Sequence, residues 1–166
     1  MNKQVLTFER LRELLHYDPN SGIFTWLESV AYHVNVGDVA GTISKETGYR
    51  TITIYYTPYR AHRLAWFYAT GNWPTGQLDH LNGSRDDNRI ANLREATSLV
   101  NSQNMRKAQI NNKSSGLLGA YRKRNKWLAQ IMVNGKQTYV GVYDTQELAH
   151  AAYVEAKRRL HIGCTI

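Results

Sequence analysis

Hydrophobic and polar residues alternate in short runs along the first two thirds of the chain, and turns rich in glycine, asparagine and proline separate these runs. The pattern predicts helices over residues 8–16, 63–70 and 97–105, and Thr7 can cap the first. It predicts strands at 23–26, 39–43, 49–55, 59–62 and 77–80, with loops at 28–38 and 84–89. Short strands mixed with short helices indicate an α+β fold.

The last third of the chain has a simpler pattern. Three strand-like runs cover residues 117–124, 126–133 and 136–143, and an Asn-Gly pair at 134–135 is a strong signal for a hairpin turn. A helix is predicted from Asp144 or Thr145 to about residue 161. Its apolar face is expected to carry Leu148, Ala149, Ala152, Tyr153 and Ala156. Three antiparallel strands and a helix would form a small self-contained module.

A polar segment at residues 111–116 separates these two parts of the pattern. It contains no apolar side chain and is the best linker in the sequence. We therefore predict a first domain at 1–110, a linker at 111–116 and a second domain at 117–166.

The positive charge is distributed unevenly between these parts. Residues 1–104 carry ten Lys and Arg against ten Asp and Glu, whereas residues 105–166 carry eleven against three, which accounts for the whole net charge of +8. Aromatic side chains are interleaved with the basic residues of the second part. We expect that part to bind a polyanion and to bring the neutral part to it. A plain alternative is that the basic residues only solvate the surface.

Composition excludes several classes of protein. The single cysteine, Cys164, excludes an intramolecular disulfide and a cysteine-based zinc site. No apolar run approaches the roughly 20 residues that span a bilayer, and the N-terminus does not resemble a signal peptide. We expect a soluble cytoplasmic protein without a membrane partner.

The candidate chemistry lies in the centre of the chain. Hydrolysis of a phosphodiester needs a base for the attacking water and a cation on the phosphate. His80 suits the base, since an imidazole can be neutral at cellular pH. Asp79 and Asn101 offer hard oxygen donors suited to Mg²⁺ or Mn²⁺. Asn92 could hydrogen-bond to the imidazole and fix its tautomer.

Each of these residues also has an ordinary explanation. Asp79 and His80 could be surface polar residues, and Asn82 and Asn88 could simply form turns. Neighbouring side chains on a strand point to opposite faces, so Asp79 and His80 do not obviously converge without a bulge or the end of the strand. The spacing from His80 to Asn92 and on to residue 101 makes a joint function more plausible.

The same stretch closely resembles phage-type HNH endonucleases, which are ββα-metal nucleases. The resemblance covers residues 59–107, and residues 11–26 also resemble the N-terminal part of phage members. The runs that carry it are His62-Arg63-Leu64, Leu78-Asp79-His80-Leu81-Asn82-Gly83, Asp87-Asn88-Arg89, Asn92-Leu93-Arg94, Thr97 and Asn101-Ser102-Gln103-Asn104.

The resemblance implies a role for each candidate residue. His80 would be the general base, Asn92 would orient it, and Asp79 and Asn101 would bind a single divalent cation. It also implies that the Asp-His pair sits where a strand meets a loop. Asn101 replaces the histidine of many relatives, and Asn104 is a second possible ligand. His62 is expected to be structural or to contact a phosphate.

The last third of the chain resembles the Apetala-two/ethylene-response-factor DNA-binding domain over residues 114–161. The matching runs are Ser115–Tyr121, Lys126–Ile131, Asn134–Lys136, Val140–Tyr143 and Glu147–Tyr153. Such domains lay a three-stranded sheet in the major groove with a helix behind it. Alternation places Trp127, Ala129, Ile131 and Val133 toward the helix.

The opposite face of this sheet is the predicted contact with double-stranded DNA. Lysine and glutamine there can hold phosphate or read bases, and tyrosine can stack. The residues assigned to DNA are Tyr121, Arg122, Lys123, Arg124, Gln130, Met132, Gln137 and Tyr139. The plant relatives use more arginine on this face. The alternative is a small interaction domain without DNA.

Together the patterns predict a metal-dependent DNA endonuclease of phage or mobile-element type. One active site per chain predicts nicking by a monomer, or cleavage of both strands by a dimer on DNA. The alternatives are a non-catalytic DNA-binding regulator on a nuclease scaffold and a nuclease directed at RNA.

Overall fold

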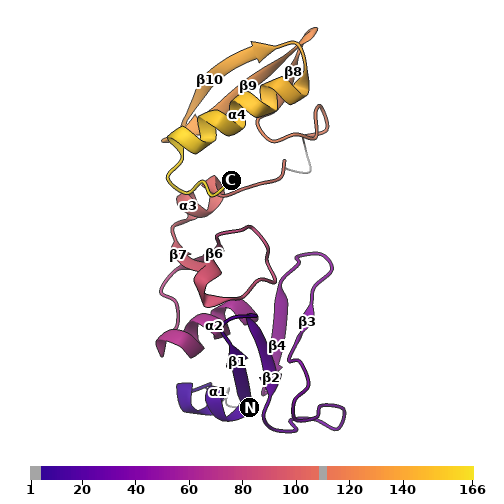
Figure 1. The fold of residues 1–166 in the computed structure, drawn as a ribbon, viewed down its shortest axis with the longest axis vertical. Coiled ribbons are helices and arrows are strands. Elements are labelled where there is room, and N and C mark those ends of the chain that lie inside the picture. The colour runs from indigo at the N-terminus through magenta and orange to yellow at the C-terminus, as the bar shows by residue number, and fades with distance from the viewer. Residues whose placement is uncertain (1–4, 109–111) are drawn as a thin grey trace. The chain divides into compact units, whose positions relative to one another are not determined.

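The computed structural model describes residues 5–108 and 112–166 (Figure 1). The start of the chain and residue 111 of the predicted linker lie outside the described residues. Contacts divide the chain into two compact units, Met1–Ala96 and Thr97–Ile166. The helix at residue 98, which we expected in the first domain, belongs by its contacts to the second unit. Small antiparallel sheets and α-helices confirm the α+β class.

The first unit opens with a helix that leads directly into a hairpin. Helix α1 (Phe8–Leu14) is capped by Thr7, whose side chain accepts a hydrogen bond from the backbone of Arg10. It ends earlier than the predicted residue 16, because β1 (Leu15–Asp18) begins at once and pairs with β2 (Ile23–Trp26). The prediction was wrong here, since pairing and burial of Leu15 outweigh continuation of the helix.

A second sheet and a helix follow. Strands β3 (Thr42–Ile43), β4 (Arg50–Ile54) and β5 (Thr57–Arg60) form a sheet in that order, and α2 (Ala61–Thr70) starts directly after β5. Helix α2 therefore begins two residues before the predicted residue 63, and His62 lies on the helix, not on a strand. Gly71 ends α2 in the left-handed conformation, as expected for a C-terminal glycine.

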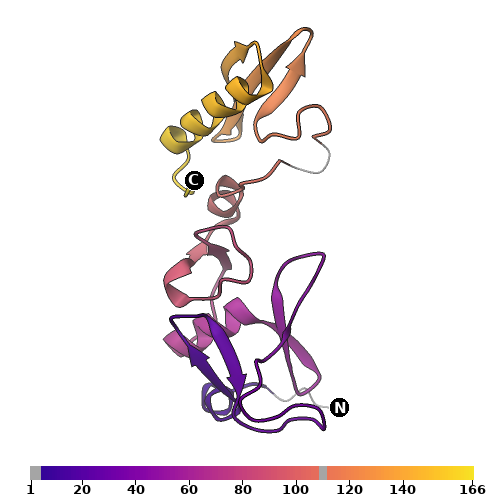
Figure 2. The same cartoon turned by 45° about the vertical axis from the view of Figure 1, so that its right-hand side comes forward.

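The core of the first unit fills the space between these elements. Helix α2 contacts α1, β4, β5 and the short 3₁₀ helix η1 (Ile90–Asn92). Figure 2 shows the β1–β2 hairpin, α1 and α2 lying close together. Its largest fully buried side chains are Phe24, Leu11, Leu14, Leu15, Ile52 and Leu64.

A two-stranded sheet completes the first unit. Strand β6 (Gln77–His80) was predicted, and it pairs with β7 (Leu93–Ala96), which the sequence pattern did not predict. The register sets Asp79 opposite Arg94 and His80 opposite Leu93. Residues 81–92 connect the two strands and return the chain to the end of β6.

The second unit contains α3 (Ser98–Gln103) and a three-stranded sheet with one long helix. Strands β8 (Ala120–Lys123), β9 (Lys126–Val133) and β10 (Lys136–Tyr143) lie in the order β10-β9-β8, and α4 (Gln146–Leu160) packs across one face (Figure 1). These strands and α4 confirm the predicted pattern. Helix α3 is shorter than predicted.

Two details of the second unit differ from the expected pattern. Leu148 was placed on the buried face of α4 but is 54% exposed, whereas Ala149, Tyr153, Ala156 and Lys157 are buried. The buried stripe follows the three- and four-residue spacing of a helix from residue 149, which leaves residue 148 outside it. Among the described residues, no helix has the length and apolar character to cross a membrane.

Candidate active site

His80 is the last residue of β6 and is enclosed by aromatic rings. Its side chain is 4% exposed, and its ring lies edge-to-face with His62 at 5.1 Å between centroids and 5.9 Å from the ring of Tyr49. Burial lowers the pKa of His80, and this effect exceeds the opposing influence of Asn88 and Asp79. The imidazole is therefore neutral near pH 7, as a base must be before it accepts a proton.

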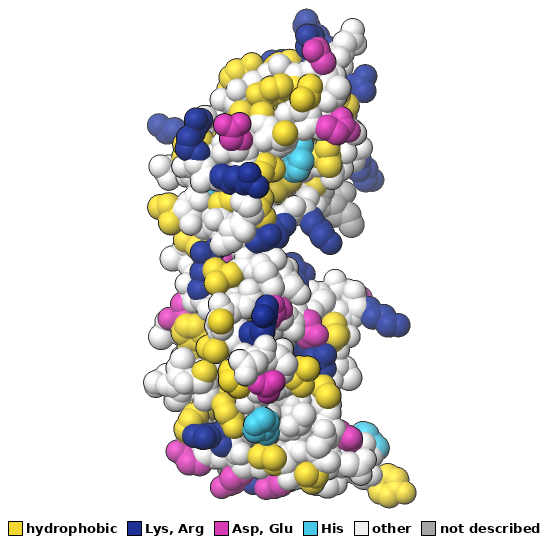
Figure 3. Space-filling view, viewed as in Figure 1, with side chains coloured by type: hydrophobic (Ala, Val, Ile, Leu, Met, Phe, Trp, Pro, Cys, Tyr) yellow, Lys and Arg dark blue, Asp and Glu magenta, His cyan; other side chains and the backbone are white. Residues whose placement is uncertain are grey.

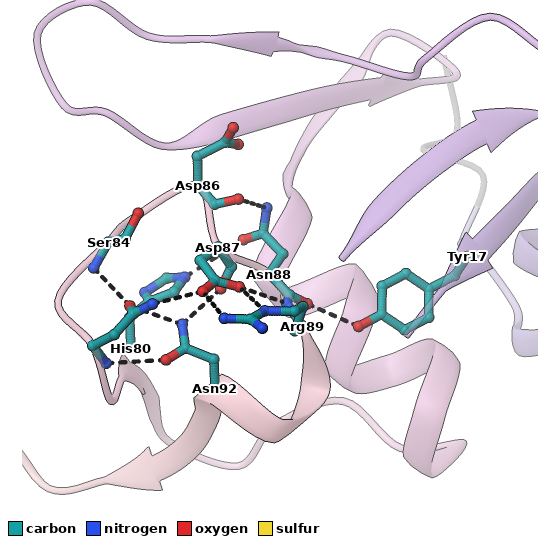
Figure 4. A network of polar contacts seen from close by, with 9 residues as sticks. Tyr17, His80, Ser84, Asp86, Asp87, Asn88, Arg89 and Asn92 are labelled. Carbon is teal, nitrogen blue, oxygen red and sulfur yellow. Dashed lines mark hydrogen bonds and ion pairs between the residues drawn. The ribbon is translucent and has the colours of Figure 1, made fainter. Parts of the chain in front are cut away.

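Asn88 provides the described hydrogen-bond contact to this imidazole. Its Oδ1 lies 3.5 Å from Nε2 of His80, at the long end of a hydrogen bond, and its Nδ2 donates to the backbone oxygen of Asp86 at 3.1 Å (Figure 4). Because the amide nitrogen is used at Asp86, the oxygen faces the ring. A proton on Nε2 would then be donated to Asn88, which makes Nδ1 the basic nitrogen.

Asn92 occupies a different position from the one we predicted. Its Nδ2 donates to Oδ1 of Asn82 at 3.0 Å and to the backbone oxygen of Asp87 at 2.8 Å, and its Oδ1 accepts from the backbone of Asn82. Both amide hydrogens are thus used within the loop. In the hydrogen bonds of the described residues, Asn88 and not Asn92 contacts His80, and Asn92 closes the loop (Figure 4).

Asp79 faces the opposite side of β6 from His80. The strand pairing is regular through both residues, so there is no bulge to turn one side chain toward the other. The expected end of the strand does occur, directly after His80. The carboxylate is 6% exposed, and its Oδ2 accepts from Nε and Nη2 of Arg94 at 3.1 and 2.8 Å. This ion pair was not predicted, because it depends on the register between β6 and an unpredicted strand.

Two hairpins hold the loop that carries Asn88. Arg50 of β4 forms a two-pronged ion pair with Asp86 at 3.0 and 3.1 Å, and Arg85 donates to the backbone oxygen of Thr47 at 2.8 Å. These contacts tie the adjacent residues Arg85 and Asp86 to the β3–β4 hairpin, one to its turn and the other to the start of β4. Such two-pronged pairs fix geometry as well as contributing energy.

The β1–β2 hairpin holds the same loop from another direction. The hydroxyl of Tyr17 donates to the backbone oxygen of Asn88 at 2.8 Å, and burial raises the pKa of Tyr17 to about 12. At Gly22, which has φ +74°, a Cβ would come within 2.4 Å of the backbone of Arg89. Glycine is required here both by the left-handed backbone and by this close approach. The N-terminal hairpin therefore positions the residue that contacts His80.

His62 is a buried partner of His80 and has an unusual electrostatic environment. It is 8% exposed, and its Nδ1 has no hydrogen-bond partner within the part of the chain that the structure describes. Burial, followed by the charge of His80, lowers the pKa of His62 to about 3. The burial of His62 agrees with the structural role that we expected for it. A contact between His62 and a phosphate stays a prediction.

The segment that carries this geometry matches a known protein family. The HNH endonuclease family profile matches residues 59–103, a segment that contains His62, Asp79, His80, Asn92 and Asn101. Protein 3.8 of Escherichia phage T7 is 32% identical over 110 residues, which is 64% of this chain and 88% of that protein. The chain belongs to the same family as this phage protein. No solved structure matches the chain.

The remaining residues of the HNH motif lie in the second unit. Asn101 is on α3, which Thr97 caps by accepting a hydrogen bond from the backbone of Val100. Asn104, our second possible ligand, is the C-cap of α3, and its Oδ1 accepts a hydrogen bond from the hydroxyl of Thr165. Within residues 5–108 and 112–166, no group of three His, Cys, Asp or Glu could hold a metal ion.

The sheet of the second unit presents most of its predicted DNA contacts on the face away from α4. Gln130 pairs with Tyr139 and Met132 with Gln137, so these four side chains share that face. Met132 is 55% and Tyr139 64% exposed. A bulge between Tyr139 and Gly141 then shifts the register of β10. In the view of Figure 3, Lys and Arg side chains are prominent over this unit.

The strand β8 divides the other predicted contacts between two faces. Tyr121 lies opposite Leu128, and Lys123 opposite Lys126, on the face away from α4. Arg122 lies opposite Trp127 instead, with its guanidinium 5.4 Å from the centre of the indole, on the side of α4. It also donates to the backbone oxygen of Arg124, which occupies the turn with φ 55°. Arg122 is therefore not aligned with the other predicted contacts.

Proposed function

We propose that the protein is a metal-dependent endonuclease that hydrolyses phosphodiester bonds in double-stranded DNA, with His80 as the general base. The observation that carries the proposal is the coincidence of two independent features. The HNH profile covers His80, and the same imidazole is neutral, enclosed by rings and in contact with Asn88 at the end of β6. A neutral, oriented imidazole is what abstraction of a proton from water requires.

In this proposal the loop residues act through His80. Asn88 fixes the Nε2 proton, so that Nδ1 takes the proton of the attacking water. Asn92 maintains the loop through Asn82 and Asp87, and is a positioning residue. A positioned base of this kind typically contributes about 10²- to 10⁴-fold to the rate.

The proposed cation ligands are oxygen donors of the kind that Mg²⁺ or Mn²⁺ prefers. At Asp79, two hydrogen bonds from Arg94 converge on Oδ2, and we assign this carboxylate as one ligand. Asn101 is assigned as the second ligand from the sequence motif alone. When bound, the cation would neutralise charge on the scissile phosphate.

The proposed role of the second unit is to hold the duplex. The half-buried Gln130 and the exposed Met132, Gln137 and Tyr139 share one face of its sheet, and this unit carries the whole net charge of +8. We propose that this face contacts DNA while the first unit cleaves one strand. In this proposal one copy of the protein nicks a single strand, and cleavage of both strands requires two copies.

One observation favours the alternative of a non-catalytic DNA-binding protein. Arg94 already supplies a positive charge to the carboxylate of Asp79 at 2.8 Å. A scaffold that had lost its metal could be stabilised in this way. The two functions differ in their response to added divalent cations, which a cleavage assay measures directly.

The test is a plasmid-nicking assay with Mg²⁺, with Mn²⁺ and with EDTA. We expect the wild-type protein to convert supercoiled plasmid to open circles only when a divalent cation is present. His80→Ala should lower the rate by about 100-fold or more while DNA binding persists. The exposed His33 provides a matched control, since His33→Ala also removes one imidazole. Equal cleavage by wild type and His80→Ala would refute the assignment of the base.

A further inference from the structure

The ring of Tyr49 carries two guanidinium groups beside the candidate base. The Cζ atom of Arg60 lies 5.2 Å, and that of Arg85 5.1 Å, from the centre of this ring. The same ring is 5.1 Å from His62 and 5.9 Å from His80. Two full positive charges therefore lie against the same aromatic ring that contacts both imidazoles.

Arg60 and Arg85 differ from the other arginines of the loop region in the groups to which they donate hydrogen bonds. Arg50, Arg89 and Arg94 each pair with a carboxylate. Arg85 instead donates to the backbone oxygen of Thr47, and Arg60 to the hydroxyl of Thr51, both of which are neutral acceptors. Where the structure describes the chain, neither Arg60 nor Arg85 has a carboxylate in ion-pair contact.

The arrangement leaves capacity for an anion. A guanidinium has five N–H donors in a plane, and one described hydrogen bond uses only one of them. Cation–π contact holds the group by its face and leaves its edge available to a ligand. Arg85 is exposed and Arg60 is half-buried, so both can reach solvent. The two like charges also repel each other, and an anion bound by both would offset that repulsion.

We propose that Arg60 and Arg85, held on the ring of Tyr49, bind a backbone phosphate of the DNA strand beside His80. The inference rests on the proposed function and adds a substrate-phosphate site within the first unit. It changes our expectation that the balanced charge of residues 1–104 leaves DNA attraction to the rest of the chain. The total is balanced, but these two charges are unpaired at the place where a phosphate would react.

The binding test uses the full chain with His80→Ala, so that cleavage does not interfere. Anisotropy of a short labelled duplex is measured over a range of salt concentrations in EDTA, for Arg60→Gln and Arg85→Gln. Because both guanidiniums hold one phosphate, the two substitutions together should reduce the log–log salt slope by about 0.9, and each one alone by part of that. Arg12→Gln is the matched control, because Arg12 lies over the rings of Phe8 and Tyr68, away from Tyr49.

Cleavage is measured separately under single-turnover conditions, with the same arginine variants made in protein that retains His80. Each of the two variants should lower kcat/KM about tenfold or more, as expected for a lost charge-assisted hydrogen bond. Arg85→Lys keeps the charge and should restore most of the salt slope but only part of the cleavage rate. Tyr49→Leu retains both arginines but removes the ring that they contact, and it should weaken cleavage. Its melting temperature shows whether the variant is folded.

Two results would overturn the inference. In the first, Arg12→Gln changes the salt slope as much as Arg60→Gln and Arg85→Gln, so that only total charge matters. In the second, the two variants bind and cleave as the parent does. If no divalent cation supports cleavage by wild type, the proposed nuclease function fails, and the salt slopes still decide whether the arginines hold a phosphate.

Discussion

Acid should destabilise the first unit through the buried imidazole of His62. Burial lowers the pKa of His62 to about 3 in the folded protein, against an ordinary value of about 6.5 when the chain is unfolded. The unfolded chain therefore gains a proton between these values that the folded chain does not accept. Because the unfolded state binds more protons there, stability falls as the pH falls. The loss begins near pH 6.5 and is complete below about pH 3.

The magnitude follows from the two pKa values. Each pH unit between them costs about 1.4 kcal/mol, and integration from pH 7 to pH 5 gives a loss of about 1.9 kcal/mol from this residue. The result depends little on the folded value, since any folded pKa below about 4 gives nearly the same loss at pH 5. His80 is also buried with a lowered pKa, so its titration lowers stability in the same direction as the pH falls.

The perturbation that isolates His62 is His62→Phe. The phenyl ring keeps an aromatic contact with Tyr49 and His80, and Nδ1 of His62 has no hydrogen bond to lose among the described residues. Urea unfolding is followed by tryptophan fluorescence at pH 7 and pH 5. The drop in the free energy of unfolding should be about 2 kcal/mol smaller for the variant. His80 contributes to both proteins, so their difference reports His62.

The reasoning would be refuted if both proteins lost the same stability between pH 7 and pH 5. That result would mean that His62 protonates as readily in the folded protein as in the unfolded chain. A titration of the His62 ring protons by NMR provides a direct check. We expect no change of its chemical shift that fits a pKa near the ordinary value.

Two further substitutions test the supports of the site. Tyr17→Phe leaves the buried backbone oxygen of Asn88 without its donor, and should lower the free energy of unfolding by about 1–3 kcal/mol in urea titrations. Tyr56→Phe, at a fully exposed position, should change it by less than about 0.5 kcal/mol. Arg94→Gln removes the cation from the buried carboxylate of Asp79 and should cost about 3 kcal/mol by the same measurement. A loss below about 1 kcal/mol would show that this carboxylate does not need Arg94.

Local signals predicted the second unit well. Asn134 and Gly135 both have positive φ in the turn between β9 and β10, which is the conformation that an Asn-Gly pair favours. Thr145 caps α4 by accepting from the backbone of Leu148, as its position before an amphipathic run suggested. Each of these features depends on residues close in sequence, so the sequence alone is sufficient to predict them.

Strands β1 and β7 could not be predicted in this way. The residues of β7, Leu93–Ala96, are good helix formers as a group, and only pairing with β6 makes them a strand. β1 follows α1 without a glycine or proline that would mark the boundary. In both cases contacts distant in sequence decide the conformation, and propensity is a weak guide.

The site shows the same division between local and distant information. The spacing of His80 and Asn92 was enough to locate the loop, but not to show which asparagine contacts the imidazole. Asn88 takes that position because Tyr17 and the turn at Gly22 fix its backbone from another part of the chain. The sequence contains no local signal for this contact, since an Asp-Asn pair in a polar loop usually forms only a turn.

Strand β6 gives two neighbouring residues opposite electrostatic environments. Alternation sends Asp79 to the side of Arg94 and His80 to the rings of His62 and Tyr49. The adjacent carboxylate favours protonated His80, but burial outweighs it and the imidazole stays neutral. A bulge that brought both side chains to one face would strengthen the attraction and favour the charged imidazole, which cannot accept a proton. The regular ladder therefore suits a base at His80 better than the convergent arrangement that we first considered.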